Sequence, residues 1–160
     1  MPNHLIAVPK SEEGLACAIG EAHRRYTRRI NFRENWRGHL WQERFASFTM
    51  DESHLLTATR YVEMNPVAAG LVGNPADYRW SSARAHLESE PDGLTKIEPL
   101  LEIVGDWRNF LSLLCSDELD LMQRHERSGR PLGATAFVED LEHRLGRVLR
   151  PQKSGPKKQE

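Results

Sequence analysis

An α+β fold is what this 160-residue sequence predicts, with strands and helices mixed in its first half and helices alone in its second. Three observations lead there. The short apolar run of residues 4–8 ends at Pro9, which is typical of a buried strand. Residues 40–50 alternate well enough for a second strand, and they carry Trp41 and Phe45. The rest of the chain shows apolar residues at helical spacing.

Two long helices are expected in the first half. One should run from Ser11, as its N-cap, to about residue 30. The other begins at residue 51 or 53, and its apolar stripe is Leu55, Ala58 and Val62. We expect it to end at about Asn65, because the residue before a proline avoids the helical region. A helical turn over 66–72 and a short helix over 77–87 should follow.

The second half reads as a linker over residues 88–95 and then helices over 97–103, 106–114, 116–127 and 134–145. The first two of these helices form an apolar pair, and we expect Trp107 and Phe110 to lie in the core. We therefore divide the chain into a first domain of residues 1–87, the linker, a helical region of residues 96–146 and a basic tail of residues 147–160, which we expect to be disordered. The last two helices are joined by a turn that contains glycine, so they form either a helix-turn-helix or an αα-hairpin with no role in DNA binding.

The composition is that of an ordinary globular protein, with 39% apolar and 28% charged residues. The longest apolar runs are too short to cross a membrane, and the first residues lack the features of a signal peptide, so we expect a cytoplasmic protein with no membrane partner. Cys17 and Cys115 have no CxxC spacing, which indicates neither a disulfide framework nor a zinc site. We expect both cysteines to pack in the core.

Charge is unevenly distributed along the chain. Residues 21–44 hold seven arginines against three acids, residues 85–126 hold three basic against ten acidic side chains, and residues 142–160 hold six against two. Basic segments can attract phosphate locally even though the net charge of the whole chain is −1. The arginines of residues 21–44 form either a solvated helix face or a stripe that follows a DNA backbone; they are Arg24, Arg25, Arg28, Arg29, Arg33, Arg37 and Arg44.

Tyr61 and Asn65 are four residues apart, on the last turn of the helix expected from residue 51. This spacing places a phenol and an amide one above the other on the same helix face, where both could serve one reaction centre. The alternative is a half-buried tyrosine on a core helix with an asparagine near its C-terminal end.

Three segments together resemble the REP-associated tyrosine transposases, which belong to the single-tyrosine, single-stranded DNA transposases named for a His-hydrophobe-His motif. The segments are Met-Pro-Asn-His-Leu-Ile-Ala-Val (residues 1–8), Gly-His-Leu-Trp-Gln-Glu-Arg-Phe (38–45), and Arg-Tyr-Val-Glu-Met-Asn-Pro-Val-Ala-Ala-Gly-Leu-Val (60–72) followed by Trp-Ser-Ser-Ala (80–83). The resemblance covers residues 1 to about 87, and residues 129–151 are similar to the C-terminal extension of longer members.

The resemblance implies a ferredoxin-like antiparallel sheet with helices and an activity on single-stranded or hairpin DNA in a bacterial cell, at the nucleoid when bound. Tyr61 would attack a phosphodiester to give a 5′-phosphotyrosine and a free 3′-hydroxyl. A phenol is a poor nucleophile at neutral pH, so Mg²⁺ or Mn²⁺ would polarise the phosphate. His4 and Asn65 would be metal ligands, and the seven arginines would contact DNA.

The sequence departs from the family pattern at its start. Members carry two histidines around one apolar residue, whereas here His4 is followed directly by Leu5 and Ile6. The strand-helix-strand portion that precedes the motif in the family is also absent. We therefore expect an N-terminally truncated transposase with an incomplete sheet and weak or no cleavage activity. Two alternatives stay open: a DNA-binding regulatory remnant without catalysis, and a decayed, poorly folded product.

Overall fold

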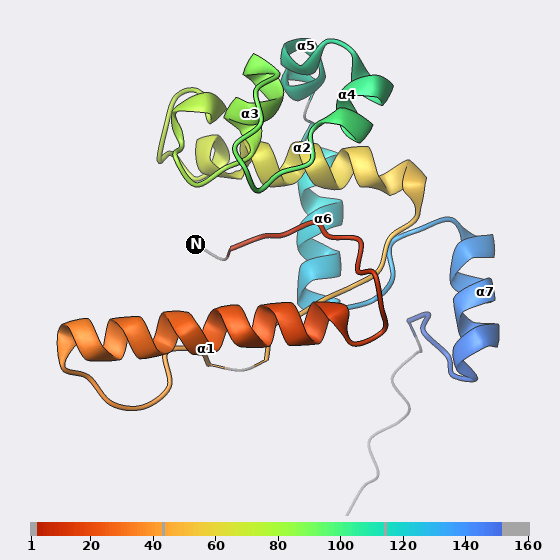
Figure 1. The fold of residues 1–160 in the computed structure, drawn as a ribbon. Helices are drawn as coiled ribbons and strands as arrows, with labels where there is room; N and C mark the ends of the chain where they lie inside the picture. The colour runs from red at the N-terminus through yellow and green to blue at the C-terminus, as the bar shows by residue number, and fades with distance from the viewer. Residues whose placement is uncertain (1–2, 43, 114, 152–160) are drawn as a thin grey trace, which may run out of the picture. The chain divides into compact units, whose positions relative to one another are not determined.

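The computed structural model describes residues 3–42, 44–113 and 115–151, and it divides by contacts into two compact units, 1–47 and 48–160 (Figure 1). The described residues form helices joined by irregular segments, and their only β-type pairing is one isolated parallel bridge between Met50 and Leu132. The predicted α+β fold with an incomplete ferredoxin-like antiparallel sheet is therefore wrong. The boundary between the units lies inside the predicted 1–87 domain.

Both predicted strands are irregular because, among the described residues, neither pairs with a second strand beyond one isolated bridge at Met50. Residues 3–9 have no regular structure, and Leu5 and Val8 are exposed in them. Residues 45–49 are irregular too, up to the single bridge at Met50. A strand leaves its backbone amides and carbonyls unpaired unless a second strand accepts them, so alternation alone does not produce a sheet.

The first unit is built on α1, Gly14–Glu34, which begins two residues later and ends four later than expected. Asn35 ends the helix in the left-handed conformation, and the chain then folds back along it. The Asn31 side chain donates to the carbonyl of Gly38, and Trp41 donates its indole N–H to Thr27. Trp41 also stacks on His23 with ring centroids 3.9 Å apart. The start of the predicted second strand, at Trp41, is thus part of a loop that packs against α1.

The second unit is organised around α2, Glu52–Ala68 (Figure 1). Its N-cap is Asp51, whose carboxylate accepts from the backbone amide of His54 and, across the unit, from that of Ala134. Burial alone would raise the pKa of Asp51, but the hydrogen bond with the His54 side chain, these two amides and the Ser53 hydroxyl outweigh it and hold the pKa well below its usual range. The helix does not end at Asn65: Pro66 lies inside it and is buried.

Proline is tolerated here because the turns that follow it close with their own hydrogen bonds. Ala69 donates to the carbonyl of Asn65, and Leu71 donates to that of Pro66. The conformational bias of a residue before proline is therefore overcome by one more turn of helix and by the burial of the ring. As a result Tyr61 and Asn65 lie on continuous helix rather than at a frayed end.

The remaining helices are the 3-10 helix Pro75–Asp77, α3 Ala83–Glu88, α4 Glu98–Val104, α5 Trp107–Ser112, α6 Ser116–Ser128 and α7 Thr135–Leu145. Of these, the 3-10 helix, α5 and α6 contact α2, whereas α3 and α4 pack on α5. The predicted helices over 97–103, 106–114, 116–127 and 134–145 are confirmed, with small changes at their ends. Helices α3, α5 and α6 all contact α2 or one another, and the predicted core residues Trp107 and Phe110 are buried together with Leu111.

Several further expectations can be compared with the described residues. Cys17 and Cys115 are free and exposed, so the prediction that they pack in the core is wrong. None of the described helices is long and apolar enough to cross a membrane. Within the predicted disordered tail, the backbone amides of Leu149 and Arg150 donate to the carboxylate of Glu142. Residues 152–160 of that tail lie outside the described residues.

Candidate functional site

The predicted nucleophile Tyr61 is buried on α2, with 5% of its surface exposed. Its hydroxyl donates a hydrogen bond of 3.0 Å to a carboxylate oxygen of Glu126, on α6. The side chain of Asn65 hydrogen-bonds to the same phenol, so the structure brings the predicted pair Tyr61 and Asn65 together. Glu126 was not a candidate in the sequence analysis, because nothing in its local pattern points to a residue 65 positions earlier.

The surroundings of Tyr61 make it a weak acid. Burial is the largest cause, the hydrogen bond and negative charge of Glu126 add to it, and Asn65 opposes it; together they raise the pKa of Tyr61 to about 12. A phenol attacks phosphorus only after its proton is lost. In the conformation described, Tyr61 is therefore protonated at neutral pH and is covered by α6.

Next to Tyr61 on α2, Arg60 forms an ion pair with Glu118 of α6. One terminal nitrogen of Arg60 lies 2.7 Å from each carboxylate oxygen, and the guanidinium lies over the ring of Phe110 with 4.5 Å to the centroid. Thr57 donates to the same carboxylate over 3.5 Å. Thus two acids of α6 accept hydrogen bonds from three donors on one face of α2. The donors are the hydroxyl of Thr57, the guanidinium of Arg60 and the phenol of Tyr61.

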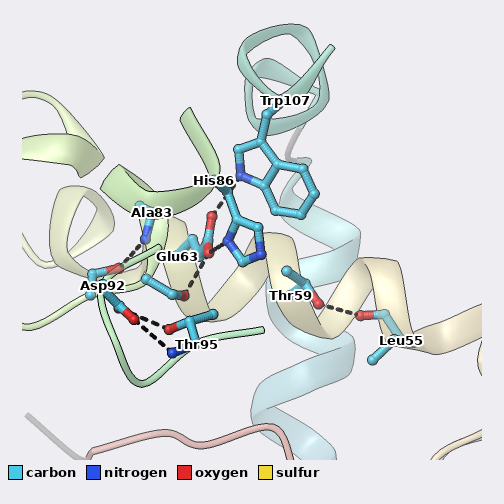
Figure 2. A network of polar contacts seen from close by, with 10 residues as sticks. Leu55, Thr59, Glu63, Ala83, His86, Asp92, Thr95 and Trp107 are labelled. Atoms are coloured by element: carbon cyan, nitrogen blue, oxygen red, sulfur yellow. Dashed lines mark hydrogen bonds and ion pairs between the residues drawn. The ribbon is translucent and has the colours of Figure 1, made fainter. Parts of the chain in front are cut away.

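A second polar cluster surrounds Glu63, the most deeply buried charged residue of the unit at 1% exposure (Figure 2). Its carboxylate accepts from Ser82 at 2.6 Å, from the Nδ1 of His86 at 2.7 Å and from the indole N–H of Trp107 at 2.8 Å. His86 and Trp107 stack with centroids 4.2 Å apart. The cluster joins α2, α3 and α5 at one point.

Three donors on one carboxylate identify Glu63 as an acceptor held in place, because an ionised carboxylate only accepts. A buried carboxylate is stable only when its oxygens are hydrogen-bonded, and here Ser82, His86 and Trp107 supply those bonds. The sequence analysis missed Glu63. The signal present was its position four and eight residues after Thr59 and Leu55, on a face of α2 that is largely covered.

His4 lies in the irregular segment before α1, not on a strand, and belongs to the first unit, whereas Tyr61 and Asn65 belong to the second. Among the described residues, no three His, Cys, Asp or Glu side chains gather as a metal site would require. The residues present therefore do not fit a preformed site for Mg²⁺ or Mn²⁺, since one neutral amide engaged with a phenol is a poor ligand set. The divalent ion stays a prediction.

All seven candidate arginines lie in the first unit. Arg24 and Arg25 both bind the carboxylate of Glu21 at 2.7 Å, and Arg33 pairs with its neighbour Glu34. The Glu21 pKa falls to about 2 because these two arginines donate to it. Arg37 and Arg44 are exposed in the segment after α1.

Arg28 and Arg29 differ from the paired arginines. Both are exposed, and neither has an ion-pair partner within the part of the chain that the structure describes. They line a surface hollow together with Thr27, Asn31, Phe32 and Trp36. Phe32 is 92% exposed and Trp36 is 59% exposed, so two aromatic faces stand beside two uncompensated guanidinium groups.

Comparison with known proteins adds no relative: no family model, no curated protein and no solved structure matches this chain.

Proposed function

We propose that this chain binds single-stranded DNA through its first unit and that Tyr61, as the structure describes it, does not cleave that DNA. The observation that carries the proposal is the hollow in which Arg28 and Arg29 stand beside exposed Phe32 and Trp36. Guanidinium groups bind the phosphates of any sequence, and aromatic faces stack on unpaired bases. Single-stranded DNA offers both phosphates and unpaired bases, so it is the partner that fits this hollow. The site of action would be the bacterial nucleoid within the cytoplasm.

The charge of the first unit supports this partner. Residues 1–47 contain eight Lys or Arg and five acids, so the unit is positive while the whole chain carries −1. Two of those acids, Glu21 and Glu34, are already paired with arginines other than Arg28 and Arg29. Arg28 and Arg29 at the hollow are exposed and have no ion pair with another described residue, so a phosphate can reach them directly.

Fluorescence anisotropy with a labelled oligothymidine tests the proposal. The double variant Arg28→Gln/Arg29→Gln should bind more weakly, and its log–log salt slope should be smaller by about 1.4, since each single-strand phosphate contact contributes about 0.7. Phe32→Ala/Trp36→Ala should lose roughly tenfold or more, because stacking of one base is worth about 1–3 kcal/mol. The matched control is Arg24→Gln/Arg25→Gln, which removes two arginines of the same helix that are already paired with Glu21.

The result that contradicts the proposal is equal weakening by both arginine pairs, because general electrostatics would then explain the binding. Equal affinity for duplex and single strand would contradict the stacking role. Cleavage has its own assay: with a hairpin oligonucleotide and Mg²⁺ or Mn²⁺, wild type and Tyr61→Phe should form equally little covalent adduct. Robust attachment of DNA through Tyr61 would show an active transposase instead.

A further inference from the structure

A row of hydrogen-bond donors runs along one face of α2. Thr57, Arg60, Tyr61 and Asn65 follow one another at the spacing that places residues on one side of a helix. The first three donate to carboxylates of α6, and the fourth hydrogen-bonds to the phenol of the third. We call these four residues the donor row.

The carboxylates that meet the donor row come from one stripe of α6. Glu118, Met122 and Glu126 recur every four residues, so they share a face, and Met122 between the two acids is buried. The other acids of this helix, Asp117 and Asp120, lie on its exposed side, where they line a hollow with Arg124 and Arg127. The two acids on the side of α6 that contacts α2 are therefore the ones that accept hydrogen bonds from the donor row.

We propose that the donor row of α2 is a phosphate-binding subsite for single-stranded DNA, and that α6 occupies it with the carboxylates of Glu118 and Glu126 until DNA displaces them. This inference rests on the proposed function for the identity of the anion. The terminal nitrogen of Arg60 that donates to both oxygens of Glu118 can donate to phosphodiester oxygens instead, because arginine binds carboxylates and phosphates alike. Thr57 and Tyr61 then donate to further phosphate oxygens.

Two details of Arg60 favour a binding role. Its Nε is buried and has no hydrogen-bond partner within the described part of the chain, so the guanidinium has donor capacity that Glu118 does not use. Its position over the ring of Phe110 does not depend on α6, because Phe110 belongs to α5. Arg60 therefore stays in place when Glu118 leaves, as a preformed subsite requires.

Helix α6 has the properties of a displaceable cover. Met122 is its one buried side chain among those described, and the polar part of its contact with α2 comes from the two carboxylates. Arg60 and Glu118 keep only 13% and 22% of their side-chain surface exposed, so the pair separates only when another anion takes the place of the carboxylate. A polyanion that offers more phosphates than α6 offers acids can therefore compete for the same donors.

The test compares two double variants of the full chain that change net charge equally. Glu118→Gln/Glu126→Gln removes the carboxylates from the donor row, and Asp117→Asn/Asp120→Asn removes two from the exposed side of the same helix. In anisotropy with labelled oligothymidine, the first variant should bind about tenfold more tightly than the second, because a hydrogen bond to a charged group is freed. Adding Arg60→Gln to the first variant should cancel that gain.

Equal affinities of the two double variants would overturn the inference, and so would a gain that survives Arg60→Gln. If the first variant loses its helical circular dichroism, hydrogen exchange on the wild type decides. The amides of α6 should exchange faster when the oligonucleotide is saturating, and unchanged or slower exchange would overturn the inference. Failure of the proposed function would look different: Phe32→Ala/Trp36→Ala would leave wild-type affinity intact, whatever the two α6 variants did.

Discussion

Trp107→Phe is the substitution that most directly tests the buried cluster around Glu63. It keeps an aromatic ring next to His86 but removes the indole N–H that donates to one carboxylate oxygen of Glu63 at 2.8 Å. The other oxygen retains its donors, Ser82 and His86. Trp107 is 3% exposed and Glu63 is 1% exposed, so water does not easily replace the lost donor.

The expected cost has two parts. Leaving a buried acceptor without its partner costs about 1–3 kcal/mol, and the upper end applies because the acceptor is a carboxylate. The smaller ring also leaves a void beside His86 and Phe110, which adds about 1 kcal/mol. We therefore expect the unfolding free energy to fall by about 2–4 kcal/mol, and the melting temperature of the second unit to fall by roughly 10 °C.

Thermal and urea unfolding followed by far-ultraviolet circular dichroism measures the change. Trp80→Phe is the matched control, because that tryptophan is 77% exposed and the same substitution there should cost less than about 0.5 kcal/mol. A double-mutant cycle with Glu63→Gln assigns the effect to the hydrogen bond: the cost of Trp107→Phe should shrink when Glu63 no longer carries a charge. If Trp107→Phe and Trp80→Phe behave alike, the carboxylate is not held as described and the reasoning fails.

Glu126→Gln should lower the pKa of Tyr61 from about 12 but not as far as 10, because burial, the largest cause, remains; alkaline absorbance titration measures it. Because folding raises the pKa of Tyr61, the protonated phenol stabilises the folded state fully below pH 10, and this stabilisation is lost between pH 10 and about 12. The unfolding free energy of the wild type should therefore fall more across that window than that of the variant. Gly133→Ala should cost about 1–3 kcal/mol, because its Cβ would overlap the Phe137 ring, whereas Gly20→Ala, with open space around it in α1, should stabilise by about 0.5–1 kcal/mol. Urea unfolding compares the two, and equal effects would contradict the packing described at Gly133.

Helical periodicity is a local property, and it located most helices of the second unit from the sequence. The apolar spacing of residues 106–114 fixed both the helix and its buried face, which carries Trp107 and Phe110. The same reasoning placed Tyr61 and Asn65 one turn apart, and α2 keeps them there. For side chains on the same helix, residue spacing was therefore sufficient to predict which of them lie close together.

The sheet failed because strand formation is not local. Residues 4–8 and 40–50 have strand-like patterns, yet a strand is stable only when a second strand forms hydrogen bonds with its backbone. The pattern within a segment does not show whether the fold places a second strand beside it. Met50 is an example, because it forms a β-bridge with Leu132 and its described neighbours do not extend that bridge into a strand pair. The contacts of Glu63 and Glu126 were missed for the same reason, since Trp107 and Tyr61 lie 44 and 65 residues away from them.

The position of Tyr61 links chemistry to the movement of α6. An attacking phenolate needs both a phosphate within reach and the loss of a proton, and in the described conformation Glu126 opposes both: it accepts the hydrogen bond from the phenol, and its negative charge repels phosphate. Glu118 acts in the same way on Arg60, the nearest cation on α2. One displacement of α6 would therefore remove two negative charges, free a guanidinium for a phosphodiester and lower the pKa of the phenol. A change confined to α2 would leave both carboxylates in place and would do none of these things.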